Sequence, residues 1–372
     1  MALVITVVLV ALVFEYINGF HDTANSIATV VSTRALTPRM AILLAASTNL
    51  WGALYGTAVA KTIASGLVDS IHVTTAVIVC ALLGGIIWNL VTWWFGLPSS
   101  SSHALIGGLC GATLGAALGS PALAGRSVWT ALIWSQPKPG EPLQAWGGLL
   151  YKVVIPMISS PILGLVVGLI LMTLLYGIAG RMKPRNVSGV FGKLQLISSS
   201  YMGWAHGSND AQKTMGVICL ALVTATKQGI FQHAPAWLQF MATADGGKNQ
   251  IIPLWIKFSC AIVMAAGTAA GGWRIIRTMG QKMVKLLPIH GFAAEATAAS
   301  VIMVAGRFGM PVSTTHAISA SIMGVGAAKR WSALNLRVIS QILVAWVLTL
   351  PCCMALGFTA IRLWHYFGWP LQ

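Results

Sequence analysis

The chain has 372 residues, of which 56% are hydrophobic and only 8% are charged, and its formal net charge is +16. Uncharged apolar runs such as 74–94 and 153–176 are long enough to cross about 30 Å of hydrocarbon, which predicts a polytopic membrane protein. Lys and Arg are scattered through the connections instead of forming one stripe, which argues against nucleic-acid binding.

About ten apolar segments follow one another along the chain. They lie near residues 2–33, 40–60, 73–95, 98–119, 149–179, 194–224, 251–273, 289–306, 311–328 and 336–361. Thirteen Lys and Arg residues fall in the connections after odd-numbered segments, against six in the connections after even-numbered ones. The positive-inside rule then places the odd-numbered connections in the cytoplasm and both termini outside.

The first segment contains the motif Gly-Phe-His-Asp-Thr-Ala-Asn at residues 19–25. A charge within an apolar span costs at least about 2.5–3.5 kcal/mol, so Asp22 is a candidate functional residue. Asn25 follows it by three positions, which places both side chains on one helix face. The dipeptide Asn18-Gly19 predicts a break in this span.

The motif Phe-Gly-Leu-Pro-Ser-Ser-Ser-Ser-His-Ala at residues 95–104 leads into the fourth segment, which opens at Pro98. Hydroxyl groups and the exposed amides of a helix start form a natural anion cradle, so we expect Ser100, Ser101 and Ser102 to bind an anion. Irregular backbone at membrane depth is tolerated only where it is buried in protein or lines a cavity. The segment is therefore predicted to be re-entrant.

A basic stretch at residues 181–193 divides the chain into two halves. We predict a first transmembrane repeat at residues 1–180, a cytoplasmic linker at 181–193 and a second repeat at 194–372. Each half then holds five segments. Because five is odd, the second half must start on the opposite side of the membrane, and such inverted repeats are typical of secondary transporters with a binding site at the repeat interface.

The sixth segment repeats the first motif as Gly-Ser-Asn-Asp-Ala-Gln-Lys at residues 207–213. Gly207 and Ser208 predict a second break. We expect Asn209 and Lys213 to contribute to an anion site and Asp210 to a cation site. The alternative is that Asp210 and Lys213 neutralise each other as a structural pair.

The ninth segment repeats the hairpin motif as Phe-Gly-Met-Pro-Val-Ser-Thr-Thr-His-Ala at residues 308–317, with six identities in ten positions. Ser313, Thr314 and Thr315 are therefore candidates for the second half of the anion cradle. His103 and His316 occupy matching positions. A lone intramembrane histidine is more often a helix-packing residue, but the matching positions favour two other roles. Either the two histidines are ligands, or they fix the hairpins by hydrogen bonding.

The chain has only seven acidic residues, so the position of each one is informative. Four of them lie within apolar segments: Glu15, Asp22, Asp210 and Glu295. Intramembrane carboxylates beside Asn and Thr suit a small hard cation or a proton, while the hydroxyls, amides and lysine suit an oxyanion. Each negative charge entering against 100 mV costs roughly 2.3 kcal/mol, which cations moving with it offset, so the pattern predicts a symporter.

In this order the motifs resemble those of the inorganic phosphate transporter (PiT) family, across residues 14–330 and in both halves. The resemblance implies a phosphate symporter of the plasma membrane, the inner membrane in bacteria, with an inverted-repeat all-α fold that is usually dimeric. It also implies that the protein is not an enzyme. By position, Asp22, Asn25 and Asp210 resemble the family's ion-site and phosphate-site residues, and Glu295 resembles an acidic residue before the second hairpin.

The motif departs from sodium-coupled relatives at His21, where they have asparagine. The chain resembles in this respect the bacterial low-affinity branch of proton-coupled carriers of phosphate and metal–phosphate complexes. Histidine titrates near neutral pH, so it could help a proton to replace sodium, and we favour proton coupling. The alternative is that His21 only fills the asparagine's space while sodium binds at Asp22 and Asp210.

Readings from other classes fit less well. An intramembrane aspartyl protease needs Tyr-Asp and Gly-x-Gly-Asp motifs, which differ from the motifs here, and a twin-histidine ammonia facilitator leaves both aspartates without a role. Transport of a related oxyanion such as sulfate remains the nearer alternative. The six cysteines show neither metal-ligand nor disulfide spacing, so we expect them to be packing residues. We also expect no resident metal or cofactor.

Overall fold

The structure, a computed structural model, describes residues 1–123, 125–247 and 250–369, so the last three residues of the predicted second repeat lie outside it. In this part of the chain the named elements are all helical, joined by short 3-10 and π segments. The α-helices are α1 (Ala2–Ser32), α2 (Pro38–Ala53), α3 (Ala58–Ser65), α4 (Thr75–Phe95), α5 (Ser101–Ala117), α6 (Ile155–Ala179), α7 (Pro184–Lys227), α8 (Leu254–Ala270), α9 (Trp273–Arg277), α10 (Pro288–Arg307), α11 (Thr314–Lys329) and α12 (Leu336–Tyr366).

Many of these helices have the dimensions of membrane spans. Within the described residues, five are long and apolar enough to cross a bilayer, and two bent pairs, α2 with α3 and α8 with α9, bring the number to seven. Helices α5 and α11 have only 17 and 16 residues, or roughly 25 Å each, which is less than the hydrocarbon thickness. The prediction of an all-α polytopic membrane protein is confirmed.

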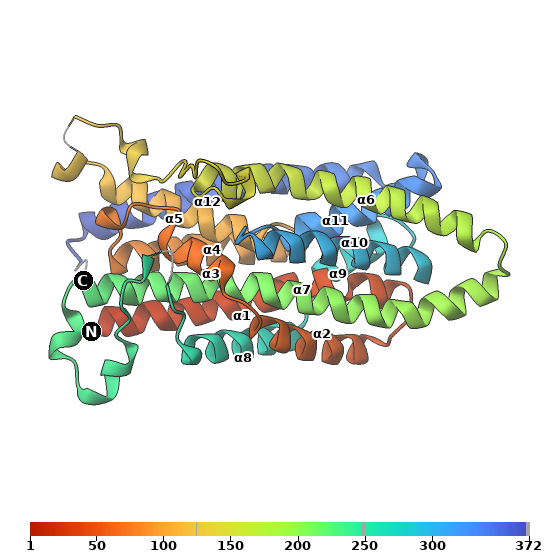
Figure 1. The fold of residues 1–372 in the computed structure, drawn as a ribbon, viewed down its shortest axis with the longest axis horizontal. Coiled ribbons are helices and arrows are strands. Elements are labelled where there is room, and N and C mark those ends of the chain that lie inside the picture. The colour runs from red at the N-terminus through yellow and green to blue at the C-terminus, as the bar shows by residue number, and fades with distance from the viewer. Residues whose placement is uncertain (124, 248–249, 370–372) are drawn as a thin grey trace.

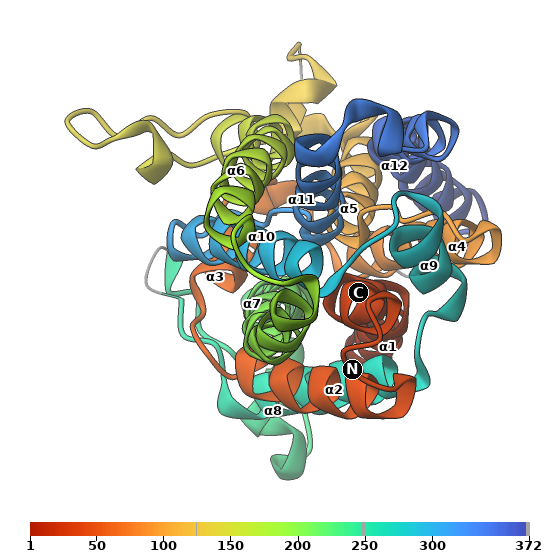
Figure 2. The ribbon, with the colours of Figure 1, turned by 90° about the vertical axis from the view of Figure 1, so that its right-hand side faces the viewer.

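The long helices lie roughly along one axis, and both termini are at the same end of the molecule (Figure 1). The turn between α6 and α7 lies at the opposite end, so that α1 and α7 run side by side in opposite directions. In the end view α1 and α7 lie at the centre, with the other helices around them (Figure 2). Apolar side chains such as Ile170 and Val347 are exposed on the outer faces of α6 and α12, as lipid contact requires.

Two helical hairpins, α4–α5 and α10–α11, enter the helix bundle from opposite ends. The repeated motif folds in the same way in both. Gly96 and Gly309 have φ of 66° and 65°, the left-handed conformation that glycine adopts without a Cβ penalty, and each ends its first arm. After the proline, Ser100 and Ser313 cap the second arm, each accepting a 3.1 Å hydrogen bond from a backbone amide three residues later.

Each hairpin packs on the last helix of the other half of the chain. Helix α5 lies against α12, and α11 lies against α6. In the same manner α1 packs on α8 while α7 packs on α2. The two halves are therefore interleaved, and the residues at the hairpin tips lie where the halves meet.

The predicted breaks in the first and sixth spans are wrong, because α1 and α7 are both continuous. Their glycines instead allow close helix contact. A Cβ on Gly19 would lie 2.5 Å from the Met264 carbonyl oxygen of α8, and one on Gly207 would meet the Asn49 backbone of α2. The true bends lie in the partner helices, 66° between α2 and α3 and 60° between α8 and α9.

Most of the predicted linker 181–193 is helical. Helix α7 begins at Pro184, so residues 184–193 of that stretch are helical. Proline at a first helical position loses no hydrogen bond, which explains why the helix starts there.

Candidate substrate and ion site

Four helix segments meet at one buried place in the middle of the molecule. They are the centres of α1 and α7 and the first turns of α5 and α11. We call the polar cluster there the central site. It comprises Asp22, Asn25, Ser101, Ser102, Asp210, Lys213, Thr314 and Thr315, none of which is more than 2% exposed.

Asp22 binds groups from both hairpin tips. Ser101 donates a hydrogen bond of 2.5 Å to its Oδ2, and the Thr315 hydroxyl lies 3.4 Å from Oδ1. The His21 Nδ1 lies 2.7 Å from the same oxygen. A buried carboxylate must be paired or hydrogen-bonded, and here its partners come from α1, α5 and α11.

Asp210 occupies the corresponding place on α7. The Thr314 hydroxyl donates to its Oδ2 at 2.8 Å, and His206 Nε2 lies 2.9 Å from that oxygen. Its other oxygen accepts from Lys213. Each aspartate is thus held by the first turn of a hairpin helix.

Lys213 links the two hairpin tips. Besides Asp210, its ammonium donates to the Ser102 hydroxyl of α5 and, at 3.0 Å, to the carbonyl of Val312 just before α11. A buried cation with three oxygen acceptors around it can exchange one of them for an oxygen of a bound anion. Both predicted roles of Lys213, in an ion pair and at an anion site, are compatible with this geometry.

Asn25 completes the connection between α1 and α11. Its side-chain amide donates to the hydroxyls of Thr314 and Thr315, at 3.2 and 3.0 Å. Asn209 lies beside the same tip and donates to the Met310 carbonyl at 3.4 Å. The remaining predicted cradle residues, Ser100 and Ser313, serve as helix caps, and their hydroxyls accept from the backbone amides of His103 and His316.

The aspartates are close enough to share a cation. Asp22, His206 and Asp210 each offer one ligand atom, and these atoms lie within 4.8 Å of one another. Carboxylate and hydroxyl oxygens are the ligands of small hard cations. His206 was not predicted, although its position four residues before Asp210 on one helix face was a usable signal.

Glu295 lies apart from this cluster. It accepts hydrogen bonds from the hydroxyls of Thr29 and Ser198 and, at 3.2 Å, from the amide of Gln195. None of these partners belongs to a hairpin tip. The structure therefore does not bring Glu295 together with Asp22 and Asp210, and its predicted role in ion coupling remains a prediction.

His103 and His316 meet face to edge, with ring centroids 4.8 Å apart. The His316 ring also stacks on Trp346 at 4.0 Å. In the described part of the chain no ring nitrogen of either histidine has a hydrogen-bond partner. The two rings thus contact each other by packing. The hydrogen bonds from these rings that were predicted to fix the hairpins are not seen among the described residues.

His21 touches the first hairpin as well as Asp22. Its Nε2 lies 3.1 Å from the Thr92 hydroxyl of α4, and that hydroxyl accepts from Ser99 at 2.8 Å. One imidazole therefore connects the carboxylate of α1 to polar groups on the first arm and at the tip of the first hairpin. Such a connection can hold or pass a proton beside Asp22.

Several known proteins are similar to this chain in sequence. The sequence profile of the Phosphate transporter family matches twice, at residues 18–186 and 178–357, once for each half. A probable low-affinity inorganic phosphate transporter of Bacillus subtilis is 41% identical, over 96% of both chains. Proteins described in the same words from Rhizobium meliloti and Mycobacterium tuberculosis are 42% and 41% identical, over 94% and 98% of this chain and 92% and 78% of their own lengths.

The fold resembles that of a solved structure described as the sodium-dependent phosphate transporter. The TM-score is 0.76, and the match covers 98% of this chain and 100% of that one. Identity over this match is 21%, so it concerns the arrangement of helices.

Proposed function

The chain belongs to the phosphate transporter (PiT) family and is a multi-pass membrane transporter of phosphate, and we propose that it is a symporter that couples phosphate import to protons at the central site. The observation that carries this proposal is the convergence of two aspartates, one lysine and the hydroxyls of both hairpin tips where the two halves meet. Sites at repeat interfaces, built from helix starts, are a recurrent plan of secondary transporters.

The anion would bind between the two hairpin tips. The hydroxyls of Ser101, Ser102, Thr314 and Thr315 and the ammonium of Lys213 all lie there, next to the positive ends of α5 and α11. Phosphate brings negative charge next to two carboxylates. Its binding is favourable only when a cation enters as well, and this requirement couples the two fluxes.

The coupling ion would be held at the aspartates. His21 favours the proton, because it lies 2.7 Å from Asp22 and can carry the charge that a sodium ion would otherwise supply. Sodium is the second candidate. The ligand atoms of Asp22, His206 and Asp210 lie close enough to hold a small cation, and the solved structure that resembles this one is described as sodium-dependent.

The same ligands bear on the transported species. A divalent metal that travels with phosphate would find two carboxylates and one imidazole, so a metal–phosphate complex is a candidate cargo. Among other oxyanions, sulfate is the main alternative as the transported species. A homodimer stays a prediction from the family resemblance.

The orientation follows from charge. The end of the bundle opposite the termini holds the basic turns before α2 and α7, so we place that end in the cytoplasm and both termini outside. The central site is closed in this structure, and movement of one half against the other would open it to either side in turn.

Matched aspartate variants test the proposal. Asp22→Asn and Asp210→Asn should each abolish uptake of radiolabelled phosphate into proteoliposomes under an inward proton gradient. Asp69→Asn is the control, because Asp69 caps a short loop helix through Ile71, a role that Asn fills equally well. Normal uptake by either site variant, or equal loss in the control, would contradict the assignment.

A further inference from the structure

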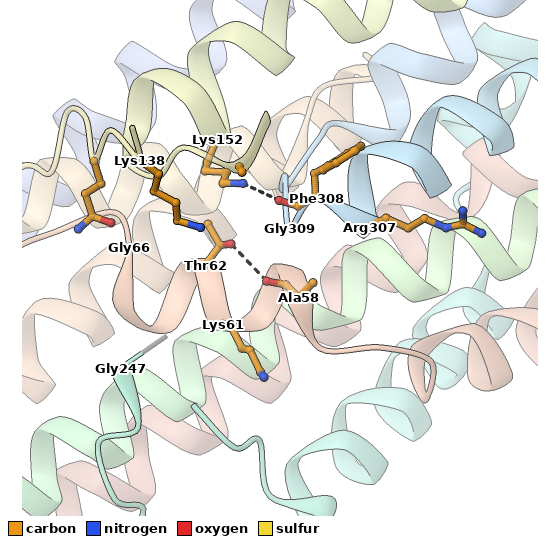
Figure 3. Close-up of a pocket in the computed structure, with 14 residues that line it drawn as sticks. Ala58, Lys61, Thr62, Gly66, Lys138, Lys152, Gly247, Arg307, Phe308 and Gly309 are labelled. Atoms are coloured by element: carbon orange, nitrogen blue, oxygen red, sulfur yellow. Dashed lines mark hydrogen bonds between the residues drawn. The ribbon is translucent and has the colours of Figure 1, made fainter. Parts of the chain in front are cut away.

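A basic cavity of about 580 Å3 lies outside the central site, between α3, the segment just before α6 and the tip of the α10–α11 hairpin (Figure 3). Ligand pockets typically occupy about 300–1,000 Å3, so it has room for a hydrated anion. Four basic residues line it, Lys61, Lys138, Lys152 and Arg307, and among the described residues that line it there is no acidic one.

The floor of the cavity is the hairpin tip that builds the central site. Gly309 lies against α3 so closely that a Cβ there would be 2.9 Å from the Ala58 carbonyl oxygen and 2.8 Å from the Thr62 hydroxyl. Three residues later, Val312 accepts the hydrogen bond from Lys213. The cavity and the central site therefore lie on either side of one short stretch of backbone.

Lys152 reaches this tip from the π-helical segment Leu150–Val154, just before α6. Its side chain is only 7% exposed, and its ammonium donates a 2.6 Å hydrogen bond to the Phe308 carbonyl. Figure 3 shows Lys138 and Lys152 extending towards the space between α3 and the tip, while Lys61 and Arg307 extend away from it. The two converging lysines thus set the charge of this space.

Lys138 comes from a loop that folds back on itself. Paired hydrogen bonds of 2.9 Å between Gln136 and Gly147 close the loop, which fixes the place of Lys138 beside the cavity. Glu141 lies 3.3 Å from its ammonium, and both side chains are exposed. An exposed pair of this kind is weak, so it does not prevent the lysine from attracting an anion.

We propose that Lys138 and Lys152 form an entry site that captures the phosphate oxyanion before it reaches the central site. This inference rests on the proposed function and adds a second phosphate-binding site, further out than the central site. A cleft with one sign of charge focuses the field and raises the local concentration of the opposite ion. Lysine serves well here, because its ammonium is a compact point charge that binds phosphate without fixed geometry.

An entry site acts on capture and leaves the later steps unchanged. Two unit charges 4 Å apart in water attract by about 1 kcal/mol, which corresponds to about fivefold in capture rate. We therefore expect Lys138→Gln to lower the ratio of maximal rate to KM by about threefold to fivefold at low ionic strength, with the maximal rate itself retained. In molar choline chloride, where the Debye length is about 3 Å, the difference should vanish.

The test compares Lys138→Gln, Lys152→Gln and Lys152→Arg with the unmodified protein in proteoliposomes of known orientation. Lys227→Gln is the matched control. Lys227 lies at the same end of the bundle and pairs with Asp245 at 2.6 Å, but it does not line the cavity. We expect Lys152→Arg to restore capture and Lys227→Gln to change nothing. The substitutions should reduce phosphate capture only in transporters whose two termini face the phosphate solution.

Several outcomes would overturn the entry site while the proposed function stands. One is an unchanged KM for phosphate in Lys138→Gln, in a preparation whose unmodified form transports phosphate. Another is a loss that persists at high salt or appears for both orientations. If the lysine variants lose phosphate uptake in vesicles containing phosphatidylglycerol but not in pure phosphatidylcholine, the cavity binds a lipid phosphate instead. Absence of phosphate uptake by the unmodified protein would instead overturn the proposed function.

Discussion

Replacing Lys213 by methionine removes a buried charge at the centre of the site. Lys213 is 1% exposed, and its ammonium donates to Asp210, Ser102 and the Val312 carbonyl. Breaking a buried ion pair by removing one partner costs about 3–5 kcal/mol, because the other charge stays buried without compensation. Asp210 keeps its contacts with His206 and Thr314, so we expect a cost near the lower end, about 3 kcal/mol.

A double-mutant cycle separates the pair from its surroundings. Asp210→Asn with Lys213→Met removes both charges, and the double variant should be more stable than the sum of the single changes predicts, by at least about 1 kcal/mol. The assay is reversible chemical unfolding of the purified protein in mixed micelles, followed by tryptophan fluorescence. Lys227→Met is the control, and since this lysine is half exposed its cost should stay below about 1 kcal/mol.

The cycle also decides between the two interpretations of the pair. If Asp210 and Lys213 bind ion and anion, the double variant regains stability but transports no phosphate. If it regains both stability and uptake, the pair is structural only and the assignment of the site is refuted. A Lys213→Met protein as stable as the unmodified one would refute the energetic reasoning.

Two further predictions concern packing and a loop. Gly267→Ala should destabilise the protein by about 1–3 kcal/mol in the same unfolding assay, because the added Cβ would press on the Tyr16 carbonyl of α1, whereas Gly177→Ala, with open space around it, should be neutral or slightly stabilising. A hydrogen bond from Lys227 lowers the pKa of Asp245, so its contribution to stability is present above its usual pKa and is lost as pH falls through the lowered value. Because the pair is exposed, Asp245→Asn should cost no more than about 1 kcal/mol at pH 7 and nothing once the carboxyl is protonated, and a larger loss in a pH series of unfolding curves would contradict this.

Repetition made the hairpins predictable from the sequence. Gly, Pro and Ser recur at the same spacing in both copies, and each has a local role. The glycine adopts the left-handed conformation that ends the first helix, the proline cannot continue that helix, and the serine caps the second helix. The scarcity of acidic residues pointed to Asp22 and Asp210, whose ligand atoms the structure brings together with His206. Local chemistry and the cost of burying a charge are readable from sequence alone.

Features that depend on a partner helix could not be read in this way. Gly19 predicted a break, but whether a glycine interrupts a helix or lets another helix approach is decided by what lies opposite, here the Met264 carbonyl. In the sequence, no local pattern sets Lys138 and Lys152 apart from other lysines. Their meeting beside the second hairpin, where Lys152 donates to the Phe308 carbonyl, depends on how α6 packs against that hairpin.

Phosphate uptake driven by one ion gradient at a time tests the central claim most directly. Proteoliposomes with an imposed inward proton gradient, or an inward sodium gradient at equal pH, would be assayed for phosphate uptake and for transported charge per phosphate. Coupling at Asp22 and His21 predicts uptake with the proton gradient in the absence of sodium, loss of that uptake in Asp22→Asn, and only a shifted pH dependence in His21→Asn. Uptake that requires sodium and does not respond to pH would contradict proton coupling at this site.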